Sequence, residues 1–91
     1  MMLQLATHAA DQVAEQLRPF CKRLEIAGSV RRKAPEVRDL EIVCIPDTRH
    51  YLAFQTLVNN WPKVRGQPDG RYTRRKLVRH NIELDLFICN A

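Results

Sequence analysis

The chain has 91 residues, of which 45% are hydrophobic, and a formal net charge of +5 at pH 7. This length allows one small domain, and the apolar content excludes a disordered chain. The positive charge favours polyanionic partners such as nucleotides, nucleic acid or anionic lipid, without choosing among them. No apolar run approaches the roughly 18 residues that span a membrane, and no signal-peptide pattern opens the chain. We therefore expect one cytoplasmic domain over residues 1–91, with no membrane partner.

Two helices are expected from apolar residues that recur at steps of three and four, over residues 3–18 and 47–61. The first should end near Arg18, because Pro19 cannot continue a helix. Between and after the helices, five segments have strand character: residues 23–28, 38–45, 61–65, 71–79 and 82–89. This order predicts an α/β (α+β) fold, a small mixed β-sheet with helices packed on one face.

Three cysteines, Cys21, Cys44 and Cys89, include no C-x-x-C pair and no partner histidine at metal-binding spacing. Cys44 and Cys89 lie inside apolar runs. We expect buried, reduced thiols, which is how free cysteine behaves in cytoplasmic proteins.

Acidic residues alternate with apolar ones in two of the expected strands. Asp39 and Glu41 share one face of the first, and Glu83 and Asp85 share one face of the last. If these strands are neighbours in the right register, all four carboxylates lie on one side of the sheet. Such a face is either solvated and paired with nearby arginines, or it binds divalent cations, because Mg²⁺ prefers carboxylate and phosphate oxygens. Spacing alone favours the solvated face.

A phosphate-binding segment precedes the first acidic pair. Gly28 lets the backbone approach a phosphate closely, and Ser29 offers a hydroxyl. Arg31 and Arg32 add planar guanidinium donors that suit phosphate oxygens. A phosphate-binding loop ahead of a carboxylate pair is what a metal–nucleotide site requires.

Together these residues resemble the DNA polymerase beta-type nucleotidyltransferase superfamily. The pattern is Ala27-Gly28-Ser29, nine further residues, Asp39-Leu40-Glu41-Ile42, and later Leu84-Asp85-Leu86. The Gly-Ser-x-Arg-Arg form is closest to the catalytic palm of family X DNA polymerases, and the resemblance spans roughly residues 20–89.

The resemblance implies a fold, a reaction and a set of residue roles. Gly28 and Ser29, helped by Arg31 and Arg32, would bind the phosphates of a nucleoside triphosphate. Two Mg²⁺ ions, for which Mn²⁺ could substitute, would be bound by three catalytic carboxylates: Asp39, Glu41 and Asp85. The implied reaction transfers a nucleoside monophosphate to an acceptor hydroxyl, with a DNA 3′-hydroxyl as the preferred acceptor, and releases pyrophosphate. Glu83 stays an alternative to Asp85 as the third carboxylate.

Three features depart from the family X pattern. Glu41 stands where these polymerases typically carry Asp, and Lys33 stands where a Gly usually follows the arginine pair. Family X polymerases also continue beyond the last carboxylate with a segment that contacts sugar and base, whereas this chain ends soon after Asp85. We therefore expect a minimal catalytic domain, truncated at its C-terminus relative to that branch, and the activity of this short chain alone stays open.

Basic residues concentrate between residues 63 and 79. A DNA-binding interpretation would assign phosphate contacts to Arg71, Arg74, Arg75 and Lys76. The alternative is an edge strand kept apart from other sheets by its charge, with some arginines neutralising the acidic face.

Two further functions remain open at this stage. A minimal nucleotidyltransferase could modify a partner protein instead of DNA. A non-catalytic nucleotide- or nucleic-acid-binding module would bind without releasing pyrophosphate. The sequence also leaves open whether the chain forms a homodimer, which base it prefers and whether it reads a template.

Overall fold

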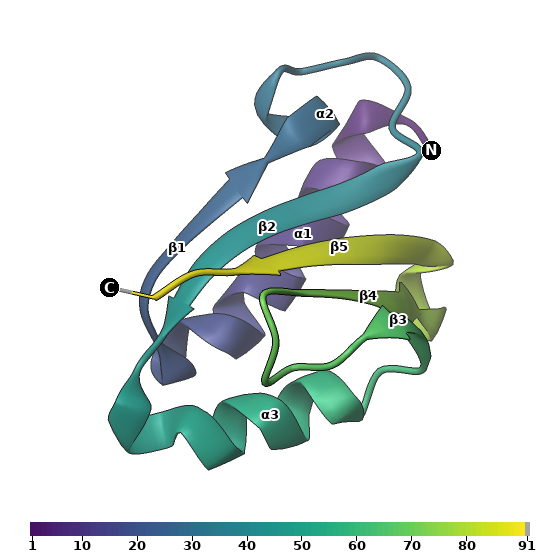
Figure 1. Cartoon of the computed structure of the whole chain (residues 1–91). Coiled ribbons are helices and arrows are strands. Elements are labelled where there is room, and N and C mark those ends of the chain that lie inside the picture. The colour runs from purple at the N-terminus through teal and green to yellow at the C-terminus, as the bar shows by residue number, and fades with distance from the viewer. Residues whose placement is uncertain (91) are drawn as a thin grey trace.

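The computed structural model describes residues 1–90, whose strands form one sheet in the order β1-β2-β5-β4-β3 (Figure 1). β2 and β5 run parallel, and every other neighbouring pair is antiparallel. The sheet is therefore mixed, as predicted. The strands are β1 (Cys21–Ala27), β2 (Asp39–Pro46), β3 (Lys63–Gly66), β4 (Tyr72–Leu77) and β5 (Ile82–Ile88).

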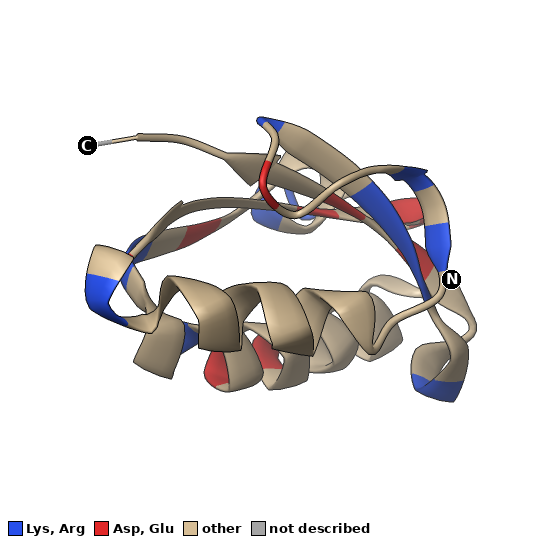
Figure 2. Cartoon of the chain, turned by 60° about the horizontal axis from the view of Figure 1, so that its bottom comes forward, with Lys and Arg blue, Asp and Glu red and all other residues tan. Residues whose placement is uncertain are grey.

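Both long helices cover the same face of this sheet. In Figure 2 they lie together below the strands, while the acidic and basic segments of the strands lie in the layer above. This arrangement confirms the predicted fold class, a mixed sheet with helices on one face. The helices are α1 (Leu3–Leu17), the single-turn α2 (Gly28–Arg31) and α3 (Tyr51–Asn59).

The core lies between the sheet and the two long helices. Small residues on α1 allow the helix to approach the sheet closely, and Leu17 at its end is completely buried. Phe54 from α3 is also completely buried, with Tyr51 and Trp61 packed against the core at its margin. Alternation along β2 and β5 sends the intervening apolar side chains inward: Leu40, Ile42, Cys44, Leu84 and Leu86. Because each acid is one residue away from an inward side chain, the acids must face outward.

Several local expectations needed correction. The helix expected over residues 47–61 is a 3₁₀ turn at Thr48–His50 followed by α3, which ends at Asn59. The side chain of Asp47 accepts a hydrogen bond from the backbone N–H of Arg49, and the nearby Arg49 side chain adds to this cap. These contacts lower the pKa of Asp47 to about 2. In the basic hairpin over residues 63–79, β3 is an edge strand of the sheet, as one interpretation expected, and β4 lies inside it.

The thiols are free, as expected, but only Cys44 is buried. Cys89 is exposed, so the prediction that it is buried was wrong. It directly follows the end of β5 at Ile88.

Within residues 1–90, no helix has the length and apolar content needed to cross a membrane.

Candidate functional site

The parallel pairing of β2 and β5 brings the acidic residues together. Asp39 is aligned with Glu83, and Glu41 is aligned with Asp85. All four are partly exposed on the face that the helices leave open. The sequence predicted that the four acids share a face if their strands are neighbours in the right register. β2 and β5 are neighbours in that register.

A single arginine from β4 occupies the middle of this acidic face. Nε of Arg74 donates to Glu83 Oε1, Nη1 donates to Asp85 Oδ2, and Nη2 donates to Asp39 Oδ1, each at 2.6 Å. The position follows from the sheet, because Arg74 is aligned with Asp85 across the β4–β5 pair. Three nitrogens of one guanidinium therefore bind three different carboxylates, the short charge-assisted geometry that arginine favours.

These contacts explain the ionisation behaviour of Arg74 and Tyr72. The hydrogen bonds that Arg74 donates to Asp85, then to Glu83 and Asp39, raise its pKa above the usual value. The Tyr72 hydroxyl donates to Asp85 Oδ1 at 2.5 Å, and this hydrogen bond raises the pKa of Tyr72. Asp85 is thus the most heavily engaged carboxylate, and only 14% of its side chain is exposed.

Glu41 differs from the other three acids. It forms no ion pair or hydrogen bond through its side chain with another described residue, although it lies on the same face. Instead its carboxyl group lies against the backbone of Gly28. A Cβ built on Gly28 would come within 2.5 Å of Cδ and Oε2 of Glu41, and Gly28 has a φ of +65°. Only glycine fits this close approach without strain.

The expected phosphate-binding segment therefore adjoins the acidic face. Gly28 begins the single turn α2, and Ser29 follows within it. Arg32 Nη2 donates to Ser29 Oγ at 3.3 Å, so these two side chains already point toward each other. Arg31 is exposed at the end of the turn. The structure places Gly28 against Glu41 and joins Ser29 to Arg32, and both Arg31 and Arg32 are exposed.

The donor set suits a hard divalent cation, since four carboxylates share one face and that of Glu41 lies beside Gly28. With the guanidinium of Arg74 between them, however, the acids are spread around a positive group. Among residues 1–90, no three His, Cys, Asp or Glu side chains are arranged to hold a metal ion. The residues fit Mg²⁺ in chemical type, and a change in the position of Arg74 would be needed for Asp39 and Asp85 to share one.

The basic residues proposed to contact DNA separate into different environments. Arg75 is only 2% exposed, so the prediction that it contacts nucleic acid was wrong. It shares the inward face of β4 with Thr73 and Leu77, and alternation from Leu77 could have revealed this. Arg74 is committed to the carboxylates. Arg71 is exposed, and Lys76 lies on the open face within 3.4 Å of the Asn81 side chain.

Sequence reasoning missed an aromatic pair beside the acids. Phe87 follows Asp85 by two residues on β5, and its ring lies 5.3 Å from that of Tyr72. Phe87 is 38% exposed. The alternation that placed Glu83 and Asp85 on the open face also places Phe87 there.

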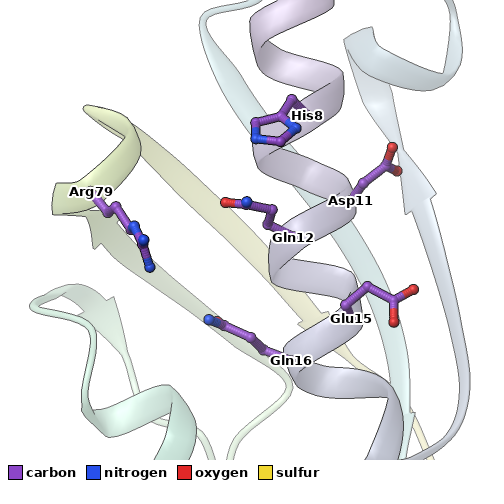
Figure 3. Close-up of a pocket in the computed structure, with 6 residues that line it drawn as sticks. All are labelled: His8, Asp11, Gln12, Glu15, Gln16 and Arg79. Atoms are coloured by element: carbon purple, nitrogen blue, oxygen red, sulfur yellow. The ribbon is translucent and has the colours of Figure 1, made fainter.

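A hollow lies away from the acidic face, between α1 and the turn before β5. It has a volume of about 420 Å³. Figure 3 shows its six lining residues: Arg79 faces α1, which contributes His8, Asp11, Gln12, Glu15 and Gln16. None of the four carboxylates of the acidic face lines this hollow, so the two surfaces are separate.

Comparison of the sequence with protein-family models and with curated proteins returned no match.

Proposed function

We propose that the chain is a metal-dependent nucleotidyltransferase that moves a nucleoside monophosphate from a nucleoside triphosphate to an acceptor hydroxyl, with a DNA 3′-hydroxyl as acceptor. The observation that supports this most directly is the pairing of Glu41 with Asp85 beside Gly28. It joins the two elements that the reaction needs, a carboxylate set and a close approach for phosphate. The resemblance of the same residues to the DNA polymerase beta-type superfamily supports the same proposal.

Each residue has a physical role in this proposal. Gly28 admits the terminal phosphates to the backbone, and Ser29 and Arg32 donate hydrogen bonds to them. Asp39, Glu41 and Asp85 would hold two Mg²⁺ ions, or Mn²⁺ in their place. When bound, these ions neutralise charge on the triphosphate and lower the pKa of the attacking hydroxyl. The acceptor oxygen bonds to the α-phosphorus, its proton passes to solvent, and the bond to the β-phosphate breaks so that pyrophosphate leaves.

The register favours Asp85 over Glu83 as the third carboxylate. Asp85 is aligned with Glu41, which adjoins Gly28, whereas Glu83 is aligned with Asp39 at the far end of the pair. A metal bound by Glu41 would therefore have Asp85 directly across the strand boundary. Both acids bind Arg74, Glu83 through Nε and Asp85 through Nη1, so the alignment with Glu41 is what distinguishes them.

The test is transfer of label from α-phosphate-labelled deoxynucleoside triphosphates to a DNA duplex with a free 3′-hydroxyl, together with pyrophosphate release. Asp85→Asn should abolish both. Asp11→Asn on α1 is the matched control, because it removes a carboxylate remote from the acidic face. Equal transfer by wild type and Asp85→Asn would contradict the proposal. Label appearing on protein instead of DNA would retain the chemistry and replace the acceptor.

A further inference from the structure

We propose that Arg74 is an internal counter-cation that competes with divalent metal for the carboxylates, and that it must leave them when a metal–nucleotide complex binds. Arg74 would then set the divalent affinity of the site. This inference rests on the proposed function, because it concerns the same carboxylates.

The geometry of the guanidinium is the first argument. Its three nitrogens reach Asp39, Glu83 and Asp85, each at 2.6 Å, so one planar group spans both β2 and β5. Two of these three acids are the proposed metal ligands. A carboxylate oxygen that accepts a short hydrogen bond from a cation cannot coordinate a metal through the same lone pair at full strength. Arg74 and the metal are therefore alternative partners of Asp39 and Asp85.

Charge supplies the second argument. Carboxylates crowded on one face repel one another when no cation is present. Arg74 relieves that repulsion with a single positive charge, whereas two divalent ions bring four. Because Glu41 has no described cation partner, it is free to receive the first ion while Arg74 still holds the others. Metal binding at Asp39 and Asp85 then requires the guanidinium to move. The free energy needed to break its ion pairs lowers the apparent affinity of the site for the metal.

The partial exposure of the Arg74 side chain is the third argument. Arg74 is partly exposed, with 23% of its side chain accessible, and it lies on the open face of the sheet. It can therefore turn into solvent without disturbing the β4 backbone or the core. Its neighbour Arg75 is buried on the opposite face and has no such freedom.

Measuring Mn²⁺ affinity with and without a positive charge at position 74 tests the inference. Arg74→Gln should bind Mn²⁺ about tenfold more tightly than wild type, as judged by the electron paramagnetic resonance signal of free Mn²⁺. Lys76→Gln is the matched control: it removes one positive charge from the same face of β4, without removing an ion pair to the acids. It should change the affinity by about twofold or less, because its charge is solvated.

Wild-type protein provides a readout that does not depend on the fold of a variant. The Nε–H resonance of Arg74 should be protected from exchange in metal-free buffer and lose protection when Mg²⁺ and a nucleoside triphosphate are added. Arg74→Lys, which retains the charge but not the fork of donors, should bind Mn²⁺ with an affinity between those of wild type and Arg74→Gln.

The outcomes separate this inference from the proposed function. Equal Mn²⁺ affinity in wild type and Arg74→Gln, with amide broadening near Asp39 and Asp85 in both, would overturn the inference and leave the metal site standing. An Arg74 Nε–H that stays protected at saturating Mg²⁺ and nucleotide would overturn it as well. Absence of broadening at the carboxylates in every protein would contradict the metal site of the proposed function itself.

Discussion

The carboxyl group of Glu41 lies against the backbone of Gly28, where a Cβ would come within 2.5 Å of it. This contact joins β2 to the turn after β1 and couples the acidic face to the proposed phosphate site. Replacing Gly28 therefore tests both elements at once.

Gly28→Ala should lower the free energy of unfolding by about 1–2 kcal/mol, because its φ of +65° is unfavourable for any residue with a Cβ. It should also weaken nucleotide binding, since the new methyl group displaces the Glu41 carboxylate. Gly70→Ala is the control, because φ is not positive there and the nearest contact would be 3.4 Å. Denaturant unfolding and a nucleotide titration measure the two effects. Equal effects from both substitutions would contradict this account of Gly28.

Metal-free stability should distinguish Glu41 from Asp39. Glu41→Gln should leave stability unchanged or raise it, because Glu41 adds repulsion without a described cation partner. Asp39→Asn should lower it by about 1 kcal/mol at most, since 38% of the Asp39 side chain is exposed to screening solvent. Thermal unfolding in the presence of a chelator measures both. A loss of stability in Glu41→Gln as large as that in Asp39→Asn would show that Glu41 also has a structural partner.

Tyr72 should titrate above its ordinary pKa of 10.0, because its hydroxyl donates to Asp85. The folded state then binds the phenolic proton more tightly than the unfolded state. Its contribution to stability is therefore complete below pH 10 and declines as the pH rises above that value. Ultraviolet titration of phenolate in a Tyr51→Phe background isolates Tyr72. Asp85→Asn should lower the midpoint, and an unchanged midpoint would contradict the assigned hydrogen bond.

Substitution of the adjacent arginines Arg74 and Arg75 on β4 should have opposite effects on stability. Arg75 donates to Thr73 Oγ1 and to the carbonyl of Trp61, but within residues 1–90 its Nη2 has no partner. Burial also lowers the pKa of Arg75. Arg75→Met should therefore keep stability within about 1 kcal/mol of wild type or raise it, because an apolar side chain of similar length needs no desolvation.

Arg74→Met should instead lower metal-free stability by about 2 kcal/mol, since it leaves three acids without their shared donor. Chemical denaturation of both variants makes the comparison. A larger loss in Arg75→Met than in Arg74→Met would contradict the roles assigned to the two faces of β4.

Much of this arrangement was predictable from local pattern. Alternation in β2 and β5 predicted which acids share a face, and the Gly-Ser step predicted a turn after β1. The side of β4 on which Arg75 lies was also available from its spacing to Leu77. What could not be predicted is the parallel register of two strands far apart in the sequence, because that depends on how the whole sheet closes.

Which of the basic residues contacts the acids could not be predicted for the same reason. The alignment of Arg74 with Asp85 exists only once β4 pairs with β5. The exposed position of Cys89 was likewise not predicted, because its apolar neighbours indicated burial whereas it lies just past the end of β5.

Substituting Asp85 and Glu83 in separate variants tests which of them is the third metal-binding carboxylate. Asp85→Asn should weaken Mn²⁺ binding strongly, because Asp85 is aligned with Glu41. Glu83→Gln should weaken it less, or strengthen it by loosening the hold on Arg74. Competition between Mn²⁺ and Mg²⁺ gives the affinities. A larger loss in Glu83→Gln would exchange the roles of these two residues.

The central claim is that metal and nucleotide bind together on the open face of the sheet. An NMR titration with Mn²⁺, with and without a nucleoside triphosphate, tests it most directly, because paramagnetic broadening reports distance from the ion. We expect broadening centred on residues 28–32, 39–41 and 83–85. Adding the nucleotide should confine the broadening more closely to these residues. Diffuse broadening over scattered acids such as Asp11, Glu25 and Asp69 would contradict it, and would leave Arg74 and its carboxylates as a solvated ion-pair network.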